Sequence, residues 1–185
     1  MSSITEKDRM EYGQLDESPR WYAVYTKFKT EKYVVERLQK KGIEAYLPLL
    51  NITKRYKSKV KKTKIPLFNC YVFVCITTAQ KASVLQTEYV YKFVKQTNRE
   101  EAIPQHEIDL LKQIVGEFEG EIISSKTEWA PGKPVEVVGG SLTGLKGKLI
   151  RKSGKNQFVV ELTSIGYELQ MEIDKTQLRM IKKVA

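Results

Sequence analysis

The sequence predicts an α+β protein whose N-terminal domain of strands and helices is followed by a small domain of strands alone. Apolar strands alternate with helical patterns up to residue 116, and from residue 131 onward short strands are separated by glycine-rich turns. The charge divides the chain in the same way, with net charges of −3 in residues 1–19, +11 in 20–116, −3 in 117–130 and +5 in 131–185. We therefore expect a flexible tail (1–19), a first domain (20–116), an acidic linker (117–130) and a second domain (131–185).

The elements of the first domain follow from its apolar patterns. RWYAVYT, residues 20–26, is rich in aromatic and β-branched residues and predicts a strand. Thr30 is placed to cap a helix running to about residue 41, where Gly42 can end it. IEAYLPL, LFNCYVFVCI and VYKFVKQ predict three further strands, and TTAQKASVLQTEY and IPQHEIDLLKQIVGEF predict two further helices. We expect an antiparallel sheet with helices packed against it, interrupted by one long basic loop.

The second domain has the pattern of a small β-barrel. VEVV, GKLIRK, QFVVEL and ELQMEI are short strands, and GGSLTG, SGKN and TSIG between them have strong turn chemistry. Several short strands joined by tight turns within about 55 residues are typical of such barrels.

The composition favours a binding protein with a polyanionic partner. The formal charge is +10, which suits nucleic acid. No segment approaches roughly 18 uncharged apolar residues and the N-terminus has no apolar central region, so we expect no membrane span, no signal peptide and a cytoplasmic location. The sequence contains no phosphate-binding glycine loop, nucleophile elbow or metal-ligand cluster, and its one histidine, His106, falls at a helix start. We therefore expect no enzymatic activity, no cofactor and no metal.

Aromatic residues gather on one predicted strand, IPLFNCYVFVCI, residues 65–76. Side chains alternate along a strand, so Tyr71 and Phe73 share one face, and Tyr25 lies on a neighbouring strand. An exposed aromatic cluster of this kind marks an interaction site. The alternative is that all of these aromatics fill the core of a small sheet.

Four segments in this order, WYAVYT, PLFNCYVFV, PGKPVEVVGGSLTGLKGKLIRK and MEIDKTQLRMI, resemble the NusG family of bacterial transcription elongation factors. The resemblance runs from about Arg20 to Ile181 and implies a NusG N-terminal domain followed by an SH3-like KOW barrel. It also implies a monomeric, non-enzymatic protein that docks on the clamp helices of the largest RNA polymerase subunit and suppresses pausing or termination. The polymerase-binding residues that it implies are Tyr25, Pro66, Leu67, Phe68, Tyr71 and Phe73.

Two groups of cations are candidates for contact with nucleic acid. Arg37, Lys40 and Lys41 lie on one side of the first helix, and in RfaH-like members of the family this face, with a basic residue matching Lys27, approaches non-template DNA. The loop KRYKSKVKKTK, residues 54–64, holds seven basic residues and no acidic one, which suits phosphate contacts to DNA or nascent RNA. The loop residues predicted to contribute are Lys54, Arg55, Lys57, Lys59, Lys61 and Lys62. A solvated helix face and a solvated loop tip are the alternatives.

In the second domain, Gly144 and Gly147 bracket Leu145 and Lys146 in the pattern of a KOW motif. We expect Gly147 to lie where a side chain would obstruct a tight turn or a neighbouring strand. Phe158 and Ile165 are apolar candidates for an edge that recruits a ribosomal protein or the Rho factor, although Phe158 could equally fill the barrel core.

One departure from the family pattern bears on function. The family usually has Phe-Pro-Gly-Tyr where this chain has Phe68-Asn69-Cys70-Tyr71, which favours a specialised RfaH-like or capsule-operon (UpxY-like) antitermination paralogue over the housekeeping member. A ribosome-associated RNA-binding protein with a KOW domain is a further alternative, but it explains the charge and not the first-domain strands. An autoinhibited free state would require the barrel to cover Tyr25 and Tyr71.

Overall fold

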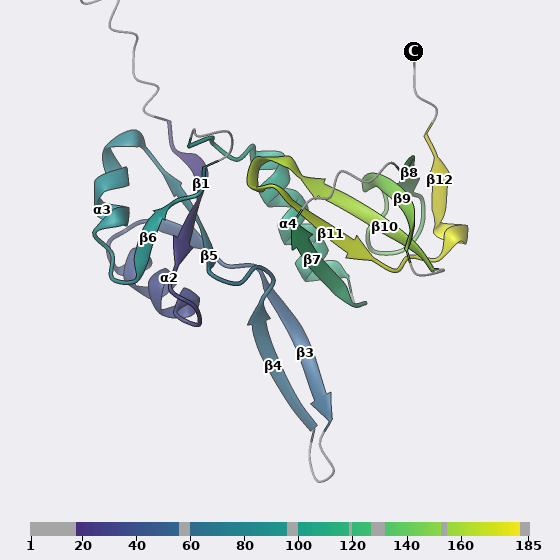
Figure 1. Ribbon diagram of the computed structural model, residues 1–185, viewed down its shortest axis with the longest axis horizontal. Helices are drawn as coiled ribbons and strands as arrows, with labels where there is room; N and C mark the ends of the chain where they lie inside the picture. Colours follow the sequence, from purple (N-terminus) through teal and green to yellow (C-terminus); the bar gives the residue numbers. More distant parts are fainter. Residues whose placement is uncertain are drawn as a thin grey trace, which may run out of the picture.

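Two antiparallel sheets and a projecting hairpin form the protein (Figure 1). The computed structural model describes residues 18–55, 60–95, 100–118, 120–126, 132–152 and 155–181, and only the backbone of 54–55, 151–152 and 155–156. The helices are α2 (Glu31–Lys40), α3 (Lys81–Leu85) and α4 (Gln105–Glu117). The N-terminal strands are β1 (Arg20–Thr26), β2 (Glu44–Tyr46), β3 (Leu49–Arg55), β4 (Val60–Pro66), β5 (Tyr71–Ile76) and β6 (Val90–Phe93). The C-terminal strands are β7 (Ile122–Lys126), β8 (Lys133–Val137), β9 (Lys146–Lys152), β10 (Lys155–Leu162), β11 (Tyr167–Met171) and β12 (Leu178–Met180).

The N-terminal sheet has the strand order β2-β5-β1-β6, with β1 and β5 paired antiparallel at its centre. Alternation gives the sheet two apolar faces. One face, with Val24, Val72 and Val74, packs with Val34 and Leu38 of α2 in a single cluster. The helix ends at Gly42, as the sequence predicts, because the φ of +72° at this glycine lets the chain reverse. Thr30 occupies the N-cap position as predicted, and its carbonyl accepts from the Val34 N–H at 2.9 Å, but its hydroxyl makes no capping bond and donates to the Lys27 carbonyl at 2.7 Å.

The second face of the sheet is covered by α4, which also packs against the C-terminal domain (Figure 1). The buried side chains of α4 at spacings of three residues, Ile108, Leu111 and Ile114, form the apolar stripe that the sequence predicts. The apolar cluster that contains this stripe also includes Trp21, Phe68 and Phe73 from the first domain and Phe158, Leu169 and Met171 from the second. The two domains therefore share one continuous core around this helix.

The C-terminal sheet has the order β12-β8-β9-β10-β11-β7. Strand β7 lies within the segment predicted as a linker and pairs with β11 over five residues, Ile122 opposite Met171 to Lys126 opposite Tyr167. The linker segment therefore adds an edge strand to this sheet. A Cβ on Gly147 would lie 2.5 Å from the Val159 carbonyl oxygen, so this glycine allows β9 and β10 to approach closely.

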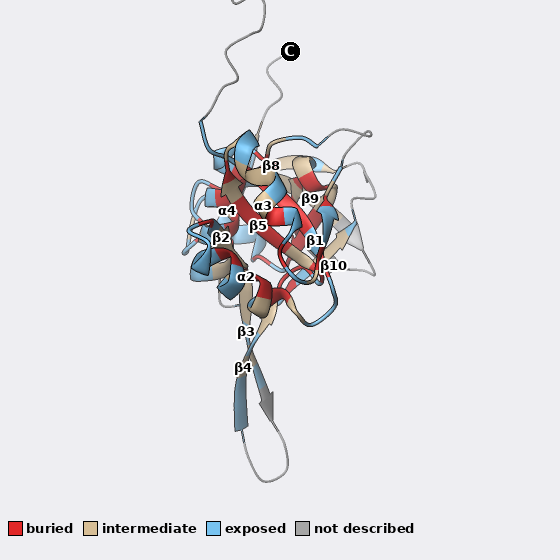
Figure 2. Ribbon diagram, turned by 90° about the vertical axis from the view of Figure 1, so that its left-hand side faces the viewer, coloured by how far each residue is buried: buried red, intermediate tan, exposed pale blue. Residues whose placement is uncertain are grey.

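The basic segment 54–64 is not a loop as expected. Its described residues belong to the β3–β4 hairpin, which pairs seven residues on each strand, from Leu49 opposite Pro66 to Arg55 opposite Val60. The hairpin projects away from both sheets, and its exposed residues contrast with the buried interior of the body (Figure 2). The predicted fold class is confirmed: an α+β arrangement of antiparallel sheets with a small β domain at the C-terminal end. No helix among the described residues is long and apolar enough to cross a membrane.

Candidate functional site

The candidate site is an aromatic cluster where β1 ends and β5 begins. Tyr25 lies directly opposite Tyr71 in the β1–β5 register, and their rings meet edge to face with centroids 5.7 Å apart. Tyr91 of β6 extends the cluster on the other side of Tyr25 at 6.4 Å, and Phe68 lies 6.5 Å from Tyr71. Tyr25 and Tyr91 are 37% and 59% exposed. Aromatic rings that are partly open to solvent give a large contact area at low entropic cost.

The backbone before Tyr71 is held in an unusual conformation. Cys70 has a φ of +66°, in the left-handed region that glycine adopts without cost, and about 1 kcal/mol of strain is expected for another residue. The buried Glu31 carboxylate accepts a hydrogen bond from the Cys70 N–H at 2.8 Å, and the Cys70 carbonyl accepts one from the Thr26 N–H at 2.8 Å. Cys70 therefore keeps the turn that precedes Tyr71, although glycine is the usual residue at this position in the family that the sequence resembles.

The pKa values of the Tyr25 and Tyr71 hydroxyls are raised, so both stay protonated well above neutral pH. Burial is the main reason that the pKa of Tyr71 is raised, and its contact with Tyr167 adds to the shift. A hydrogen bond with the Cys70 side chain is the main cause of the raised pKa of Tyr25. The site is thus a neutral surface of rings and hydroxyls.

The C-terminal domain covers part of this cluster. The ring of Tyr167, at the start of β11, lies 5.2 Å from that of Phe68 and 5.4 Å from that of Tyr71, edge to face in both cases. Phe68 is 1% exposed, because it packs in the shared core and against the Tyr167 ring. The Ser124 hydroxyl of β7 also donates to the Leu67 carbonyl at 2.7 Å, so two strands of the second domain touch the segment that leads to Tyr71.

A second contact joins the domains on α4. The Glu107 side chain, 6% exposed, accepts a hydrogen bond from the Thr163 hydroxyl at 2.9 Å and a longer one from the Ser164 N–H at 3.4 Å. Ile165, in the same short turn, is buried. The turn that was expected to recruit a partner is therefore engaged within the molecule.

The other side of the cluster remains open. A cavity of about 540 Å³ lies beside Tyr25 and Tyr71 and is otherwise lined by residues 92–95 of β6 and the chain after it. Lys92 and Lys95 give this opening a cationic edge. The structure therefore has an aromatic surface that is half covered by its own second domain and half accessible.

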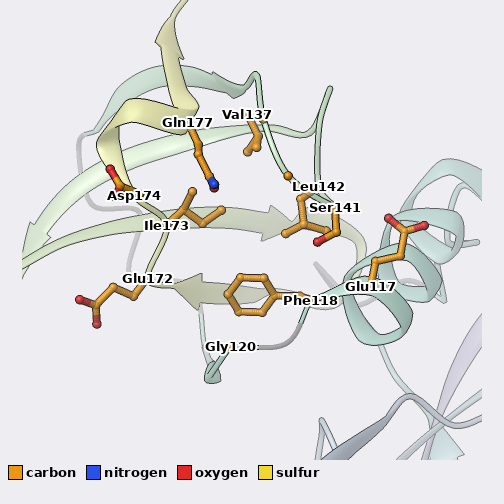
Figure 3. Close-up of a pocket in the computed structure, with 12 residues that line it drawn as sticks. Glu117, Phe118, Gly120, Val137, Ser141, Leu142, Glu172, Ile173, Asp174 and Gln177 are labelled. Atoms are coloured by element: carbon orange, nitrogen blue, oxygen red, sulfur yellow. The ribbon is translucent and has the colours of Figure 1, made fainter.

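A separate cavity of about 380 Å³ lies between the end of α4 and the barrel (Figure 3). Phe118, Leu142 and Ile173 supply apolar side chains, whereas Glu117 and Asp174 bring carboxylates to it. These acidic groups disfavour contact with nucleic acid. No group of residues within the described ranges has the composition of a metal site.

The predicted polymerase-binding residues fall into two groups. Tyr25 is exposed, and Tyr71 and Pro66 are partly exposed, whereas Leu67, Phe68 and Phe73 are buried. Phe73 is 0% exposed because the face it shares with Tyr71 is covered by α4, so it belongs to the core. The sequence missed Tyr91 and Tyr167, and only the pairing of β6 with β1 and the packing of the domains bring them to the cluster.

The cations predicted on α2 lie on a face that also carries aromatic rings. The Arg37 guanidinium lies 4.9 Å from the Tyr33 ring centroid and donates to the Tyr33 hydroxyl at 2.8 Å, and that hydroxyl donates to Glu88 at 2.6 Å. Hydrogen bonds from Tyr33 and Tyr89 lower the pKa of Glu88. Lys27 lies 5.3 Å from the centroid of the Tyr89 ring. Tyr33 and Tyr89 are partly exposed, and aromatic rings interleaved with cations are usual on surfaces that bind single-stranded nucleic acid.

The remaining predicted cations lie in different settings. Lys40 is exposed on α2, whereas the Lys41 ammonium donates to the Ser83 carbonyl at 2.9 Å and to the Thr87 hydroxyl at 2.8 Å. Lys61 and Lys62 are exposed on β4. Lys54 and Arg55 are on β3, where only the backbone is described, and Lys57 and Lys59 lie outside the described residues.

The KOW residues lie at a turn and in the barrel core. Gly144 has a φ of +89°, and Gly147 approaches both Val159 and the Phe158 ring. Phe158 is 0% exposed and fills the core, so it offers no binding edge. This is the alternative that the sequence left open for Phe158.

Together the fold and the site define a two-domain α+β protein that pairs an aromatic-faced antiparallel sheet with a small β domain. A family model described as "Transcription termination factor nusG" matches residues 19–112, just over half of the 185-residue chain. The chain belongs to the NusG family. No curated protein matches its sequence.

One solved structure supports this assignment at the level of fold. The structure described as "Domain interaction in Thermotoga maritima NusG" superposes with a TM-score of 0.54 at 17% identity, covering 89% of this chain and 98% of that one. The MjSpt4:Spt5 complex in conformation A matches with a TM-score of 0.29 at 18% identity, covering 88% of this chain and 99% of that one. The first of these matches shows that the chain has a NusG-like fold.

Proposed function

We propose that this NusG-family protein is a transcription elongation factor that docks on RNA polymerase through Tyr25, Tyr71 and the rings around them. The observation that carries the proposal is the half-open aromatic cluster at the end of β1, next to a cavity with Lys92 and Lys95 at its edge. Neutral hydroxyls and rings suit the side of a partner helix, and the lysines suit acidic residues beside it.

The covering of this cluster by Tyr167 supports a closed resting state. A partner helix and Tyr167 would use the same faces of Phe68 and Tyr71, so docking requires the second domain to move away. The contacts of Thr163 and Ser164 with Glu107 would break in the same step, which frees the turn around Ile165 for a second factor such as a ribosomal protein or Rho. Separation of the two domains would thus couple docking on polymerase to recruitment of the second factor.

The cations support a role close to nucleic acid. Lys27, in the turn before α2, and Arg37 and Lys40 on α2 lie near the rings of Tyr33 and Tyr89, in a combination suited to an exposed DNA strand in the transcription bubble. Operon-specific antitermination is the form of the activity that we favour over a housekeeping role. The Phe68-Asn69-Cys70-Tyr71 segment supports it, since it departs from the Phe-Pro-Gly-Tyr usual in the family and Cys70 keeps the turn through its contact with Glu31.

The test is binding of the full chain to bacterial RNA polymerase elongation complexes. Tyr25→Ala removes an exposed ring that β1 does not need for its core, and we expect binding to weaken by about 2 kcal/mol, roughly thirtyfold. Met180→Ala is the matched control, because Met180 is 54% exposed on β12, at the other end of the C-terminal strand order from β7. Equal binding by the wild type and the Tyr25→Ala variant would refute docking through this surface.

A further inference from the structure

The β3–β4 hairpin is a two-stranded ribbon that extends from the body on its own (Figures 1 and 2). Its strands pair only with each other in the described structure. An isolated two-stranded ribbon is marginally stable in water, and segments that project from a rigid body often carry binding residues, so the ribbon is a candidate binding surface.

The two faces of the ribbon differ. Residues directly opposite each other share a face, and one face carries the pairs Asn51 with Lys64 and Thr53 with Lys62. All four of these side chains are exposed. The other face carries Leu50, Ile65, Ile52 and Thr63, all of them partly buried. The exposed face therefore presents two rows of donors and acceptors along the hairpin.

The charge of the hairpin calls for an anionic partner. Lys62 and Lys64 are exposed two residues apart on the same face of β4, so two like charges lie close together there and repel each other. The sequence has no acidic residue between Glu44 and Glu88, so no carboxylate on the hairpin neutralises its lysines. A row of phosphates would relieve this repulsion and release counterions.

The shape and chemistry of the exposed face fit duplex DNA. The major groove of B-DNA is about 12 Å wide and admits a two-stranded β-ribbon, and lysine, asparagine and threonine are side chains that read its base edges. The deep major groove of duplex RNA does not admit side chains in this way. Binding to single strands depends on aromatic stacking, and no aromatic residue occurs in the described parts of β3 and β4; Tyr56 lies outside the described residues.

We propose that the β3–β4 hairpin binds duplex DNA by placing the face formed by Asn51, Thr53, Lys62 and Lys64 in the major groove. The lysines supply most of the affinity through phosphates, and Asn51 and Thr53 favour particular base pairs. This inference deepens the nucleic-acid part of the proposed function, because it assigns double-stranded DNA to the hairpin and leaves the exposed single strand to α2. It does not depend on docking to polymerase.

The experiment measures binding of the full chain, without polymerase, to a DNA duplex of about two helical turns. The same sequence as single-stranded DNA and as an RNA duplex provides the comparison. We expect the DNA duplex to bind at least about tenfold more tightly than either. The double variant Lys62→Gln, Lys64→Gln should weaken duplex binding by about tenfold or more and reduce the slope of log affinity against log salt by about 2.

The matched control is the double variant Lys126→Gln, Lys175→Gln, which removes the same charge from exposed lysines of the second domain. Equal losses in the two double variants would overturn the proposal, because they would reflect net charge alone. Stronger binding of the single strand or of the RNA duplex by the hairpin lysines would also overturn it and assign the ribbon to that ligand.

Base reading is tested with duplexes whose central base pairs are randomised. We expect the wild type to enrich particular sequences, and Asn51→Ala with Thr53→Ala to lose this enrichment while keeping the salt slope. Absence of enrichment by the wild type would overturn insertion into the groove. Because Tyr25→Ala leaves the hairpin intact, that variant should bind duplex DNA normally, so failure of polymerase docking and failure of the hairpin proposal are distinguishable.

Discussion

Removal of the Tyr167 ring should open the two domains. Tyr167 meets Phe68 and Tyr71 edge to face at 5.2 and 5.4 Å, and each such pair contributes about 0.5–1.5 kcal/mol beyond area burial. Tyr167→Ala therefore costs the closed state about 1–3 kcal/mol, which shifts the balance between closed and open forms by roughly 5- to 150-fold. The shared core around α4 and the Glu107 contacts remain, so this is a shift in population rather than complete separation.

Backbone ¹⁵N relaxation provides the direct assay. The closed wild type should tumble as one body with one rotational correlation time, whereas Tyr167→Ala should give shorter and separate times for the two domains. Affinity for polymerase elongation complexes should rise in the same variant, because less of the protein is closed. Met180→Ala, at an exposed position on β12, is the control. An unchanged correlation time together with unchanged polymerase affinity would refute the idea that Tyr167 holds the domains closed.

Three other changes test separate parts of the fold. Gly147→Ala should destabilise the C-terminal domain by about 2–4 kcal/mol in denaturant unfolding, because its Cβ would lie 2.5 Å from the Val159 carbonyl oxygen; a loss below about 1 kcal/mol would show that the strands adjust. Cys70→Val should cost about 1–3 kcal/mol, since a β-branched residue fits a φ of +66° poorly, whereas Cys70→Gly should stay within about 1 kcal/mol of the wild type. Burial raises the pKa of Tyr46 from 10.0 to about 12, so its contribution to stability is complete below pH 10 and is lost as pH rises toward 12. Tyr46→Phe should reduce the fall in unfolding free energy over that range, and an unchanged pH profile would contradict this reading.

The sequence was sufficient for features that depend on local pattern. The strand at residues 20–26, the helix ending at Gly42 and the stripe of α4 come from short-range periodicity and turn chemistry, and each is present in the structure. The pairing of Tyr25 with Tyr71 on one face also follows from alternation, once the two strands are taken as neighbours.

Features that depend on contacts between distant segments could not be predicted from the sequence. The basic segment was expected to be a loop, but its residues 60–64 pair with residues 51–55 although lysine is depleted in strands. The strand β7 is short and polar, and only its pairing with β11 distinguishes it from a linker. Phe73 shares a face with Tyr71, yet it is buried because α4 covers one end of that face and not the other.

The end of β1 contacts both the aromatic cluster and the cationic surface around α2. Consecutive backbone N–H groups at Thr26 and Lys27 donate to the carbonyls of Cys70 and Tyr89, and both acceptor residues have positive φ values. Cys70 leads directly into Tyr71 of the aromatic cluster, whereas Tyr89 carries the ring beneath Lys27 on the cationic face. Residues 26 and 27 thus hold both Cys70 and Tyr89 in left-handed conformations, each of which costs about 1 kcal/mol of backbone strain. Under the proposed function, a partner that docks on the aromatic cluster would therefore meet an α2 surface whose position relative to the cluster is already fixed by this segment.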